Sequence, residues 1–244
     1  AQAIESYELA LAIKEDFPAA LYNMGNAYAN LGRMFEAIEA YKKTLEIEPG
    51  DVPAWHNLGN AYEELGQYAK AVECFTKAIE FDDLHYESYF GRGCSYDALD
   101  QPRKALADYR KALSIFADYP ELWYARADAE YNLKRYEDCL LSYRMVLKLD
   151  PTNAEAWFDY GDTLQELGKT EEAVTALNEC LRLAPQFAPA FYSMAKAHLL
   201  RGDKAGALES LRKAFEIDAE LKKSFVLEFP SLSAMREFRR LLKL

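Results

Sequence analysis

The side chains that most often carry out catalysis or bind metals are few in this sequence and far apart. Its three histidines, His56, His85 and His198, show neither an HExxH motif nor the Cys/His spacing of zinc sites. Its four cysteines form no CxxC pair and are too few for a disulfide framework, which fits a reducing compartment such as the cytoplasm. Phosphate-binding glycine motifs and the GxSxG nucleophile motif do not occur. We therefore expect no enzyme activity, no metal and no cofactor.

The composition and the charge balance exclude further classes of protein. The 244 residues include 29 basic and 40 acidic side chains, which gives a formal net charge of −11. A nucleic-acid partner is not expected, because phosphate binding requires clustered Lys and Arg. No stretch approaches the roughly 20 consecutive apolar residues that a membrane-spanning helix needs. The composition is that of a soluble globular protein.

Residues of the same kind recur along the chain with a fixed period of 34 residues. The small residues of this pattern are Gly25, Gly59, Gly93, Ala127, Gly161 and Ala195. The large apolar residues are Leu21, Trp55, Tyr89, Trp123, Trp157 and Phe191. No insertion breaks the register, so the chain is predicted to be an array of structural repeats.

Within one period the apolar residues define two helical faces. The first has the spacing i, i+3, i+4, i+7 and consists of Trp55, Leu58, Gly59 and Tyr62. The second has the spacing i, i+4, i+7 and consists of Ala71, Phe75 and Ala78. Gly66 lies between them and is predicted to end the first helix in a left-handed conformation. The small residues should allow the two helices to approach closely.

Two parts of this unit carry a resemblance to a known family. They are residues 55–62, with the sequence WHNLGNAY, and the spaced residues Ala71, Phe75 and Ala78. With the 34-residue period they resemble the tetratricopeptide repeat (TPR) family. The resemblance implies an all-α solenoid of antiparallel helix pairs, wound as a right-handed superhelix, in which the first helix of each pair lines a concave groove. The expected boundaries are a half repeat at 1–17, full repeats at 18–51, 52–85, 86–119, 120–153, 154–187 and 188–221, and C-terminal capping helices at 222–244.

The resemblance also implies which side chains line the groove. They are Tyr22, Asn26, His56, Asn60, Glu63, Phe90, Cys94, Asp97, Tyr124, Asp128, Phe158, Asp162, Tyr192 and Lys196. Aromatic rings provide rigid contact area, and carboxylates select cations. The expected ligand is a protein or peptide segment with basic and apolar side chains. The alternative is that the acidic residues only keep the protein soluble.

Two arginines stand where the other repeats have apolar residues or tyrosine. Arg92 and Arg126 occupy these positions, and an arginine that faces the core needs a partner. Asp108 is the only acidic residue at its position of the second helices. We expect an ion pair from Asp108 to Arg92 or Arg126 that joins the third and fourth full repeats. A ligand-binding role for the arginines is the alternative.

The two ends of the array lead to separate expectations. The half repeat has a second helix without a first one, so its face of Ala3, Tyr7 and Ala10 should contact further residues upstream or another copy of the chain. Residues 222–244 have six basic and two acidic side chains, and they should form a cap over the last repeat. A basic amphipathic helix that contacts an acidic surface is the alternative.

These observations favour a protein-interaction scaffold that binds a partner segment in its groove and performs no chemistry. The alternative is the substrate-selecting segment of a larger enzyme or of a secretion or assembly machine. The missing initiator Met and the half repeat favour that alternative. Neither the identity of the partner nor the pathway follows from the fold class.

Overall fold

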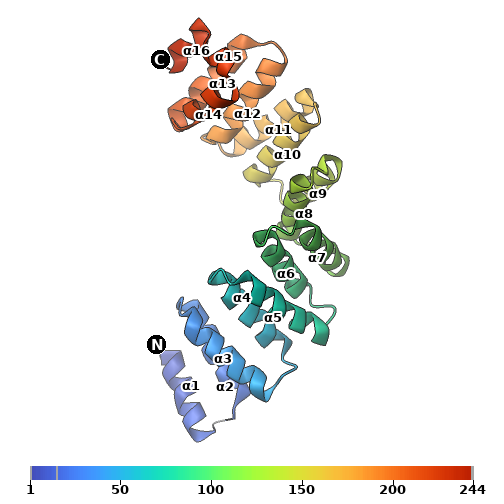
Figure 1. Cartoon of the computed structure of the whole chain (residues 1–244), viewed down its shortest axis with the longest axis vertical. Helices are drawn as coiled ribbons and strands as arrows, with labels where there is room; N and C mark the ends of the chain where they lie inside the picture. Colours follow the sequence, from blue (N-terminus) through green and yellow to red (C-terminus); the bar gives the residue numbers. More distant parts are fainter. Residues whose placement is uncertain (1, 15, 243–244) are drawn as a thin grey trace. The chain divides into compact units, whose positions relative to one another are not determined.

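The computed structural model describes residues 2–14 and 16–242, and this part of the chain contains sixteen helices and no strand. The chain divides into two compact units, Ala1–Leu133 and Lys134–Leu244. The helices of the first unit are α1 (Gln2–Ile13), α2 (Pro18–Asn30), α3 (Met34–Ile47), α4 (Val52–Glu64), α5 (Tyr68–Phe81), α6 (Tyr86–Ala98), α7 (Pro102–Ile115) and α8 (Pro120–Asn132) (Figure 1). Those of the second unit are α9 (Tyr136–Leu149), α10 (Ala154–Glu166), α11 (Thr170–Leu183), α12 (Ala188–Leu200), α13 (Lys204–Ile217), α14 (Leu221–Glu228), α15 (Pro230–Ser233) and α16 (Arg236–Leu242).

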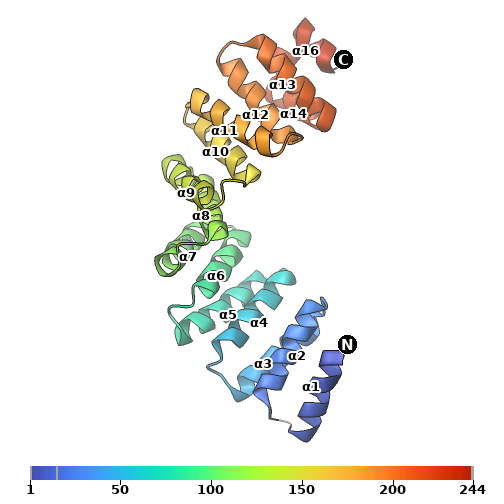
Figure 2. The same ribbon diagram turned by 180° about the vertical axis from the view of Figure 1, so that it is seen from behind.

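Consecutive helices form antiparallel pairs within each unit, as the 34-residue period predicts. The pairs are α2 with α3, α4 with α5, α6 with α7, α10 with α11 and α12 with α13 (Figure 2). The predicted fourth repeat, residues 120–153, is divided between the units, since α8 belongs to the first and α9 to the second. The all-α fold class and the pairing of the helices are thereby confirmed. Among the described residues, no helix combines the length and apolar character needed to cross a membrane.

Short polar and glycine signals set the ends of the helices. The side chain of Asp51 accepts a hydrogen bond from the backbone N–H of Ala54 at 2.9 Å and so caps α4. Gly66 has a φ of 67°, which confirms the predicted left-handed end of that helix. Asp100 and Lys134 adopt the same conformation without being glycine, with φ of 57° and 56°. The left-handed residue that ends the first helix of a pair is therefore kept even where glycine is missing.

Close approach within a pair depends on the small residues of the first helix. A Cβ atom added to Gly25 would lie 2.6 Å from the ring of Tyr41, and one added to Gly59 would lie 2.7 Å from the ring of Phe75. Both rings are buried. The predicted close approach of the paired helices is confirmed at these two positions.

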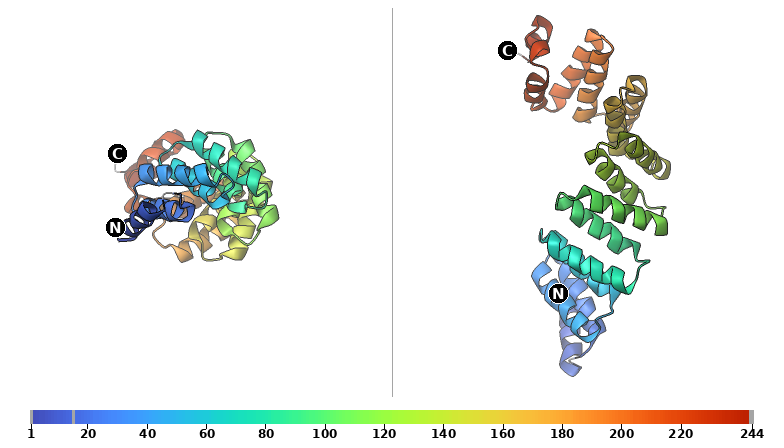
Figure 3. Two further views of the ribbon diagram at one scale, coloured as in Figure 1. Left: turned by 90° about the horizontal axis from the view of Figure 1, so that it is seen from below. Right: turned by 45° about the vertical axis from the view of Figure 1, so that its right-hand side comes forward.

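The two ends of the described chain are covered differently. At the C-terminal end the last helices, drawn in red, lie beside the orange helices of the preceding pair (Figure 3). Phe225 of α14 and Phe238 of α16 stack at 5.6 Å between ring centroids and are buried with residues of α12 and α13. At the other end α1 packs on α2, and its outer residues Leu9 and Ile13 are 68% and 89% exposed. Of the predicted face of α1, Tyr7 and Ala10 are half-buried, and the side chain of Ala3 lies outside the described residues.

Candidate functional site

The first helices of successive repeats lie side by side within the first unit. Helices α2, α4, α6 and α8 contact one another in this order, and we call the surface they form with their outward side chains the first-helix face. Ten of the predicted groove residues belong to these helices: Tyr22, Asn26, His56, Asn60, Glu63, Phe90, Cys94, Asp97, Tyr124 and Asp128. The other four, Phe158, Asp162, Tyr192 and Lys196, belong to α10 and α12 of the second unit. The two sets are described separately.

At the α2–α4 end of this face, hydrogen bonds between repeats hold the amide side chains. Asn57 Nδ2 donates to Tyr22 OH at 3.0 Å and to Asn26 Oδ1 at 2.9 Å. Tyr41 OH also donates to Asn26 Oδ1, at 2.7 Å. Burial raises the pKa of Tyr41 to about 12, so this phenol remains a neutral donor. Asn57 and Tyr41 are missed by sequence reasoning as partners of the groove residues, although Asn57 lies 31 residues after Asn26, close to one period.

A pocket of about 420 Å³ opens beside these amides. Its lining consists of Asn26, Ala29, Asn30, Met34, Tyr41, Asn57, Asn60, Ala61 and Glu64. Four asparagines present both donors and acceptors to this space. Such a surface can pair with the N–H and C=O groups of an extended peptide.

Two histidines and a serine form a hydrogen-bonded chain at the next step along the face. The backbone N–H of Ser88 donates to His85 Nδ1 at 3.2 Å, so the Ser88 hydroxyl, 2.9 Å from that nitrogen, must donate to it as well. His56 Nδ1 then donates to Ser88 Oγ at 3.2 Å, and His56 Nε2 accepts from Asn60 Nδ2 at 3.1 Å. His56 thus donates through Nδ1 and accepts through Nε2, so its imidazole is neutral in this arrangement. Burial, and next the proximity of His85, lower the pKa of His56 to about 4.

The described residues contain no group of three or more His, Cys, Asp or Glu that could hold a metal ion. Cys94 was predicted to face the groove, and it is half-buried, with its Sγ 3.7 Å from Tyr109 OH. Burial raises the pKa of this thiol to about 11, so it is protonated at neutral pH. His56 and Cys94 are therefore both held in neutral forms at neutral pH.

The predicted carboxylates differ in how freely they face solvent. Glu63 Oε1 accepts from Ser95 Oγ at 2.6 Å, and Asp97 Oδ2 accepts from Tyr109 OH at 2.6 Å. Burial raises the pKa of both carboxyl groups. Glu63 therefore joins two repeats, and Asp97 joins the two helices of one repeat. Glu64, the next residue of α4, is exposed instead.

Aromatic side chains gather around Phe90 at the start of α6 and α8. The ring of Phe90 lies edge to face with Tyr119 at 5.6 Å, and Tyr86 lies 6.3 Å from Tyr119 in the same manner. Tyr86 also contacts Phe116 at 4.8 Å. Sequence reasoning misses the contributions of Tyr86, Phe116 and Tyr119. Tyr119 could have been found from its place in the repeat. It occupies the capping position that Asp51 has two repeats earlier.

In the second unit a residue of the C-terminal segment occupies the predicted surface. Glu228 of α14 pairs with Lys196 Nζ at 2.8 Å and accepts from Tyr192 OH at 2.8 Å. Tyr192 is buried, so it contributes little surface to a ligand. Asp162 accepts a hydrogen bond from Ser193 Oγ, and burial raises the pKa of its carboxyl group. Of the four predicted residues here, Phe158 keeps an apolar surface, with its ring 5.2 Å from Phe187.

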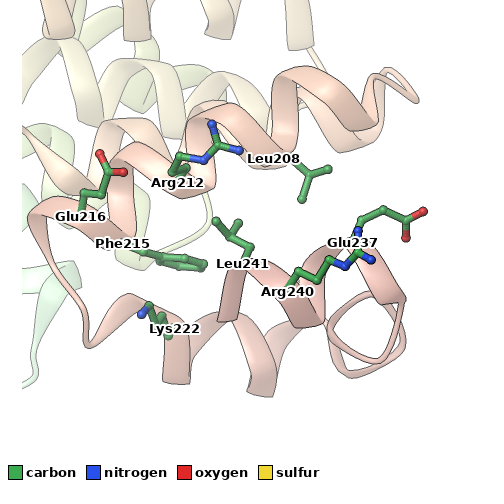
Figure 4. A pocket seen from close by; sticks show the side chains of 8 residues that line it. All are labelled: Leu208, Arg212, Phe215, Glu216, Lys222, Glu237, Arg240 and Leu241. Carbon is green, nitrogen blue, oxygen red and sulfur yellow. The ribbon is translucent and has the colours of Figure 1, made fainter. Parts of the chain in front are cut away.

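Figure 4 shows a separate pocket of about 650 Å³ in the C-terminal part of this unit. The side chains of Leu208 and Phe215 from α13 and of Leu241 from α16 form its apolar part. Arg212 and Arg240 lie at its border with acidic neighbours, as the figure labels them. This mixture of charges on a short terminal helix defines no specific ligand.

The ion pair predicted for Asp108 forms with Arg92. Arg92 Nε and Nη2 donate to the two carboxylate oxygens at 2.7 and 2.8 Å, and its Nη1 donates to Thr76 Oγ1 at 3.1 Å. The prediction that the pair joins the third and fourth repeats is wrong, because Arg92 and Asp108 belong to the same repeat and Thr76 to the preceding one. Arg126 pairs instead with the fully buried Glu130, at 3.0 Å.

Models of known protein families match the same repeats that the helix pairs form. Sequence models of the tetratricopeptide repeat match residues 16–83, 52–118, 120–153, 142–175 and 188–221. A comparison with curated proteins gave no match.

Solved structures share the fold at low sequence identity. YrrB, described as a TPR protein with an unusual peptide-binding site, is 24% identical, with a TM-score of 0.71 over 78% of this chain and 98% of that one. The C-terminal part of a TPR protein from Cytophaga hutchinsonii is 18% identical, with a TM-score of 0.77 and 92% of both chains covered. A chain of the APC/C hetero-tetramer Cut9–Hcn1 is 17% identical, with a TM-score of 0.64, and covers 99% of this chain but only 45% of its own length. The repeat matches and the paired helices together show that this chain belongs to the tetratricopeptide repeat family.

Proposed function

We propose that the chain is a protein-interaction scaffold whose first-helix face binds an extended segment of a partner protein. The observation that carries this proposal is the pocket lined by Asn26, Asn30, Asn57 and Asn60. Asn26 and Asn57 are held by hydrogen bonds to Tyr22 and Tyr41, so their amides are oriented before a ligand arrives. Preorganised amide groups bind a peptide backbone with a smaller loss of entropy than mobile ones.

The rest of the face favours a segment with basic and apolar side chains. The rings of Tyr86, Phe90 and Tyr119 provide a rigid apolar surface. Glu64 and Asp128 are exposed on α4 and α8, where they add negative potential without being buried. Complementary charge of this kind steers a basic ligand and rejects an acidic one.

The scaffold is proposed to perform no chemistry of its own. His56 bonds to Ser88 and Asn60 as a neutral imidazole, and the thiol of Cys94 is protonated and half-buried. Neither arrangement supplies an activated nucleophile or a free general base. The likeness to YrrB, described as having a peptide-binding site, supports a binding role for the same fold.

A second proposal is that the chain is the partner-selecting segment of a larger assembly. The observation in its favour is that the whole chain aligns with less than half of a chain in the Cut9–Hcn1 complex. In that case the same face would select the partner. We also propose that the chain self-associates through the exposed Leu9 and Ile13 of α1. Sedimentation of a Leu9→Lys, Ile13→Lys variant tests this.

The test of the main proposal is binding of a fluorescent peptide array to variants with reversed charge. We expect peptides with alternating Lys or Arg and Leu to bind the wild-type protein, less tightly as salt rises. A Glu64→Lys, Asp128→Lys variant should bind them about tenfold more weakly. The control carries the same charge change on second helices, at the exposed residues Glu137 and Glu172. Equal loss of binding in both variants, or no binding of basic peptides by the wild type, would refute the proposal.

A further inference from the structure

Four aromatic rings meet at the N-terminal ends of α6 and α8. They belong to Tyr86 and Phe90 of α6, to Phe116 after α7 and to Tyr119 before α8, and we call this group the aromatic corner. The Tyr119 ring lies at 83° to the Phe90 ring and at 73° to the Tyr86 ring. Phe90 also packs on the buried Tyr109, at 6.0 Å between ring centroids. None of the four rings is itself buried, and Phe116 is 40% exposed, so the corner is a fixed aromatic surface that solvent reaches.

Two of these rings stand at positions where the other full repeats have small, aliphatic or acidic residues. The residues that correspond to Tyr86 are Pro18, Val52, Pro120, Ala154 and Ala188. Those that correspond to Phe116 are Glu48, Asp82, Asp150, Ala184 and Asp218. Folding of the repeat therefore does not require an aromatic ring at either position.

A third ring takes the place of a helix cap. Asp51 and Asn153 stand at the position of Tyr119 in other repeats, and each accepts a hydrogen bond of 2.9 Å from the backbone of the helix that follows. Tyr119 makes no such bond, so α8 begins without a side-chain cap. Since a side-chain cap stabilises a helix, the ring of Tyr119 replaces a contact that would stabilise α8.

The two segments that form the corner are acidic. Residues 81–91 and 112–125 contain five Asp or Glu residues and no Lys or Arg. The basic residues that border these segments contact other groups: Lys77 pairs with Glu80 at 2.6 Å, Arg92 with Asp108 at 2.7 Å and Arg126 with Glu130 at 3.0 Å, and Lys111 lies 5.9 Å from the centre of the Tyr89 ring. The acids of the corner are therefore not neutralised by the lysines and arginines next to them in sequence.

Two of these acids lie beside the rings. Glu87 is in the first turn of α6, and Glu121 is in the first turn of α8. Burial raises the pKa of Tyr119, and the negative charges of Glu121 and Glu87 add to this rise, so both carboxylates are near the same phenol. Glu121 is exposed, and the side chain of Glu87 is 45% exposed, with His85 Nε2 3.8 Å from its carboxylate. A ligand can therefore reach both carboxylates.

The rings of the corner also differ from other aromatic rings of the chain in their contacts with cations. Lys or Arg groups lie within 6 Å of the ring centres of Phe17, Tyr28, Tyr62, Tyr89, Tyr96, Trp123, Tyr160, Phe191 and Tyr192. Within the part of the chain that the structure describes, no Lys or Arg lies over the four rings of the corner in this way. A cation over an aromatic ring is favourable. A cationic side chain of a ligand therefore meets no competing Lys or Arg at these rings.

Of the two basic side chains, arginine fits this surface better. Its guanidinium group is planar and weakly hydrated, so one face can stack on a ring while the N–H groups in its plane donate to carboxylates. The ammonium group of lysine is compact and strongly hydrated, so more water must be removed from it. The corner supplies both contacts that a guanidinium group needs, because it combines exposed rings with a carboxylate on each of two helices.

We propose that the aromatic corner selects an arginine side chain of the bound segment, with the guanidinium group stacked on Tyr119 and hydrogen-bonded to Glu87 and Glu121. This inference rests on the proposed function, because the segment is the one that the first-helix face binds. It adds that the face distinguishes arginine from lysine, which negative potential alone does not do.

Three fluorescent peptides of equal length test the selection by fluorescence polarisation. They alternate Leu with Arg, Leu with Lys, or Leu with trimethyl-lysine, so their charges are the same. We expect the wild-type protein to bind the Arg peptide about tenfold more tightly than either of the others. Tyr119→Asn, which copies the capping residue Asn153, should narrow this preference to about twofold.

Phe187→Asn is the matched control. It places the same residue at the same position of a repeat in the second unit, where α12 also begins without a side-chain cap, and it should keep the tenfold preference. Circular dichroism shows whether each variant is folded. If Tyr119→Asn does not fold, a Glu87→Gln, Glu121→Gln variant decides, because it keeps all four rings and should also narrow the preference to about twofold.

The outcomes separate this inference from the proposed function. Equal affinity of the wild type for the Arg and Lys peptides overturns the inference and leaves the proposed function in place, whereas binding of neither peptide overturns both. A trimethyl-lysine peptide that binds as tightly as the Arg peptide overturns the assignment to arginine. The inference also fails if a folded Tyr119→Asn or Glu87→Gln, Glu121→Gln variant keeps the tenfold preference, or if Phe187→Asn loses it.

Discussion

The ion pair of Arg92 and Asp108 can show whether the polar residues of one repeat can be replaced by the apolar residues that stand at the same positions in another repeat. The pair has two hydrogen bonds of 2.7 and 2.8 Å, and the side chains are only 16% and 9% exposed. An Asp108→Cys variant would leave the guanidinium group without its carboxylate. Breaking a buried pair costs about 3–5 kcal/mol. Arg92 keeps its hydrogen bond to Thr76 and remains partly exposed. We therefore expect a loss of unfolding free energy at the lower end of this range, about 3 kcal/mol.

The compensating change copies the preceding repeat. Arg92→Leu together with Asp108→Cys installs the residues found at Leu58 and Cys74, which pack in the same surroundings. Replacing a buried ion pair by apolar residues is often neutral or stabilising. The unfolding free energy of the double variant is therefore expected within about 1 kcal/mol of the wild-type value, although Asp108→Cys alone lowers it by about 3 kcal/mol.

Urea unfolding followed by circular dichroism measures all the variants under the same conditions. The quantity that decides is the coupling free energy of the cycle, which should reach at least about 2 kcal/mol. A double variant as unstable as Asp108→Cys alone would refute the idea that the two kinds of occupant are interchangeable. A cost below about 1 kcal/mol for Asp108→Cys would show that the pair contributes no more than a surface ion pair does.

Three further predictions concern other contacts. Because the folded-state pKa of His56 is about 4, against 6.5 unperturbed, the folded protein binds fewer protons, and stability should fall by up to roughly 3 kcal/mol between pH 6.5 and 4. Urea midpoints against pH, with His56→Gln as the control that removes this loss, measure it. Gly25→Ala should cost about 1–3 kcal/mol in thermal unfolding, because its Cβ would lie 2.6 Å from the Tyr41 ring. Lys196→Met should cost less than about 1 kcal/mol in the same assay, because its partner Glu228 is 42% exposed.

Each of these has an outcome that contradicts it. A pH dependence that is the same in His56→Gln and in the wild type would place the titrating group elsewhere. A Gly25→Ala variant with wild-type stability would mean that the Tyr41 ring moves aside at no cost. A large loss in Lys196→Met would show that the contact with Glu228 is more than a solvent-screened pair.

The helical period shows which of the predicted groove residues share a face, but only the resemblance to the tetratricopeptide repeat family indicates that this face lines a groove. Tyr22 and Asn26 lie four residues apart on one helix, so they must share a face, and the same offset returns in every repeat. The partners of these residues depend on contacts between helices. Asn57 bonds to Asn26 from 31 residues away and Ser95 bonds to Glu63 from 32 residues away. Because these offsets are shorter than the 34-residue period, comparison of equivalent positions does not reveal them.

The ion pair shows the same limit within a repeat. Sequence reasoning left two arginines as partners of Asp108, and the structure selects Arg92 because antiparallel helices of one pair place residues 16 apart in contact. The same offset joins Arg92 to Thr76 of the preceding repeat and Arg144 to Tyr160 in the second unit. A rule of 16 residues in either direction would have found all three contacts. The period alone contains no information on which direction is used.

The contact between the helices of a pair constrains neighbouring positions differently. Gly59 must stay small, since the Phe75 ring occupies the space of any side chain. Leu58 beside it is buried, yet the equivalent positions of the next three repeats have Arg92, Arg126 and Tyr160. Each of these polar side chains has a partner of its own, in Asp108, Glu130 and Arg144. The repeat therefore accepts a polar side chain at this position where a second residue satisfies it, which is why the substitutions have to be tested in pairs.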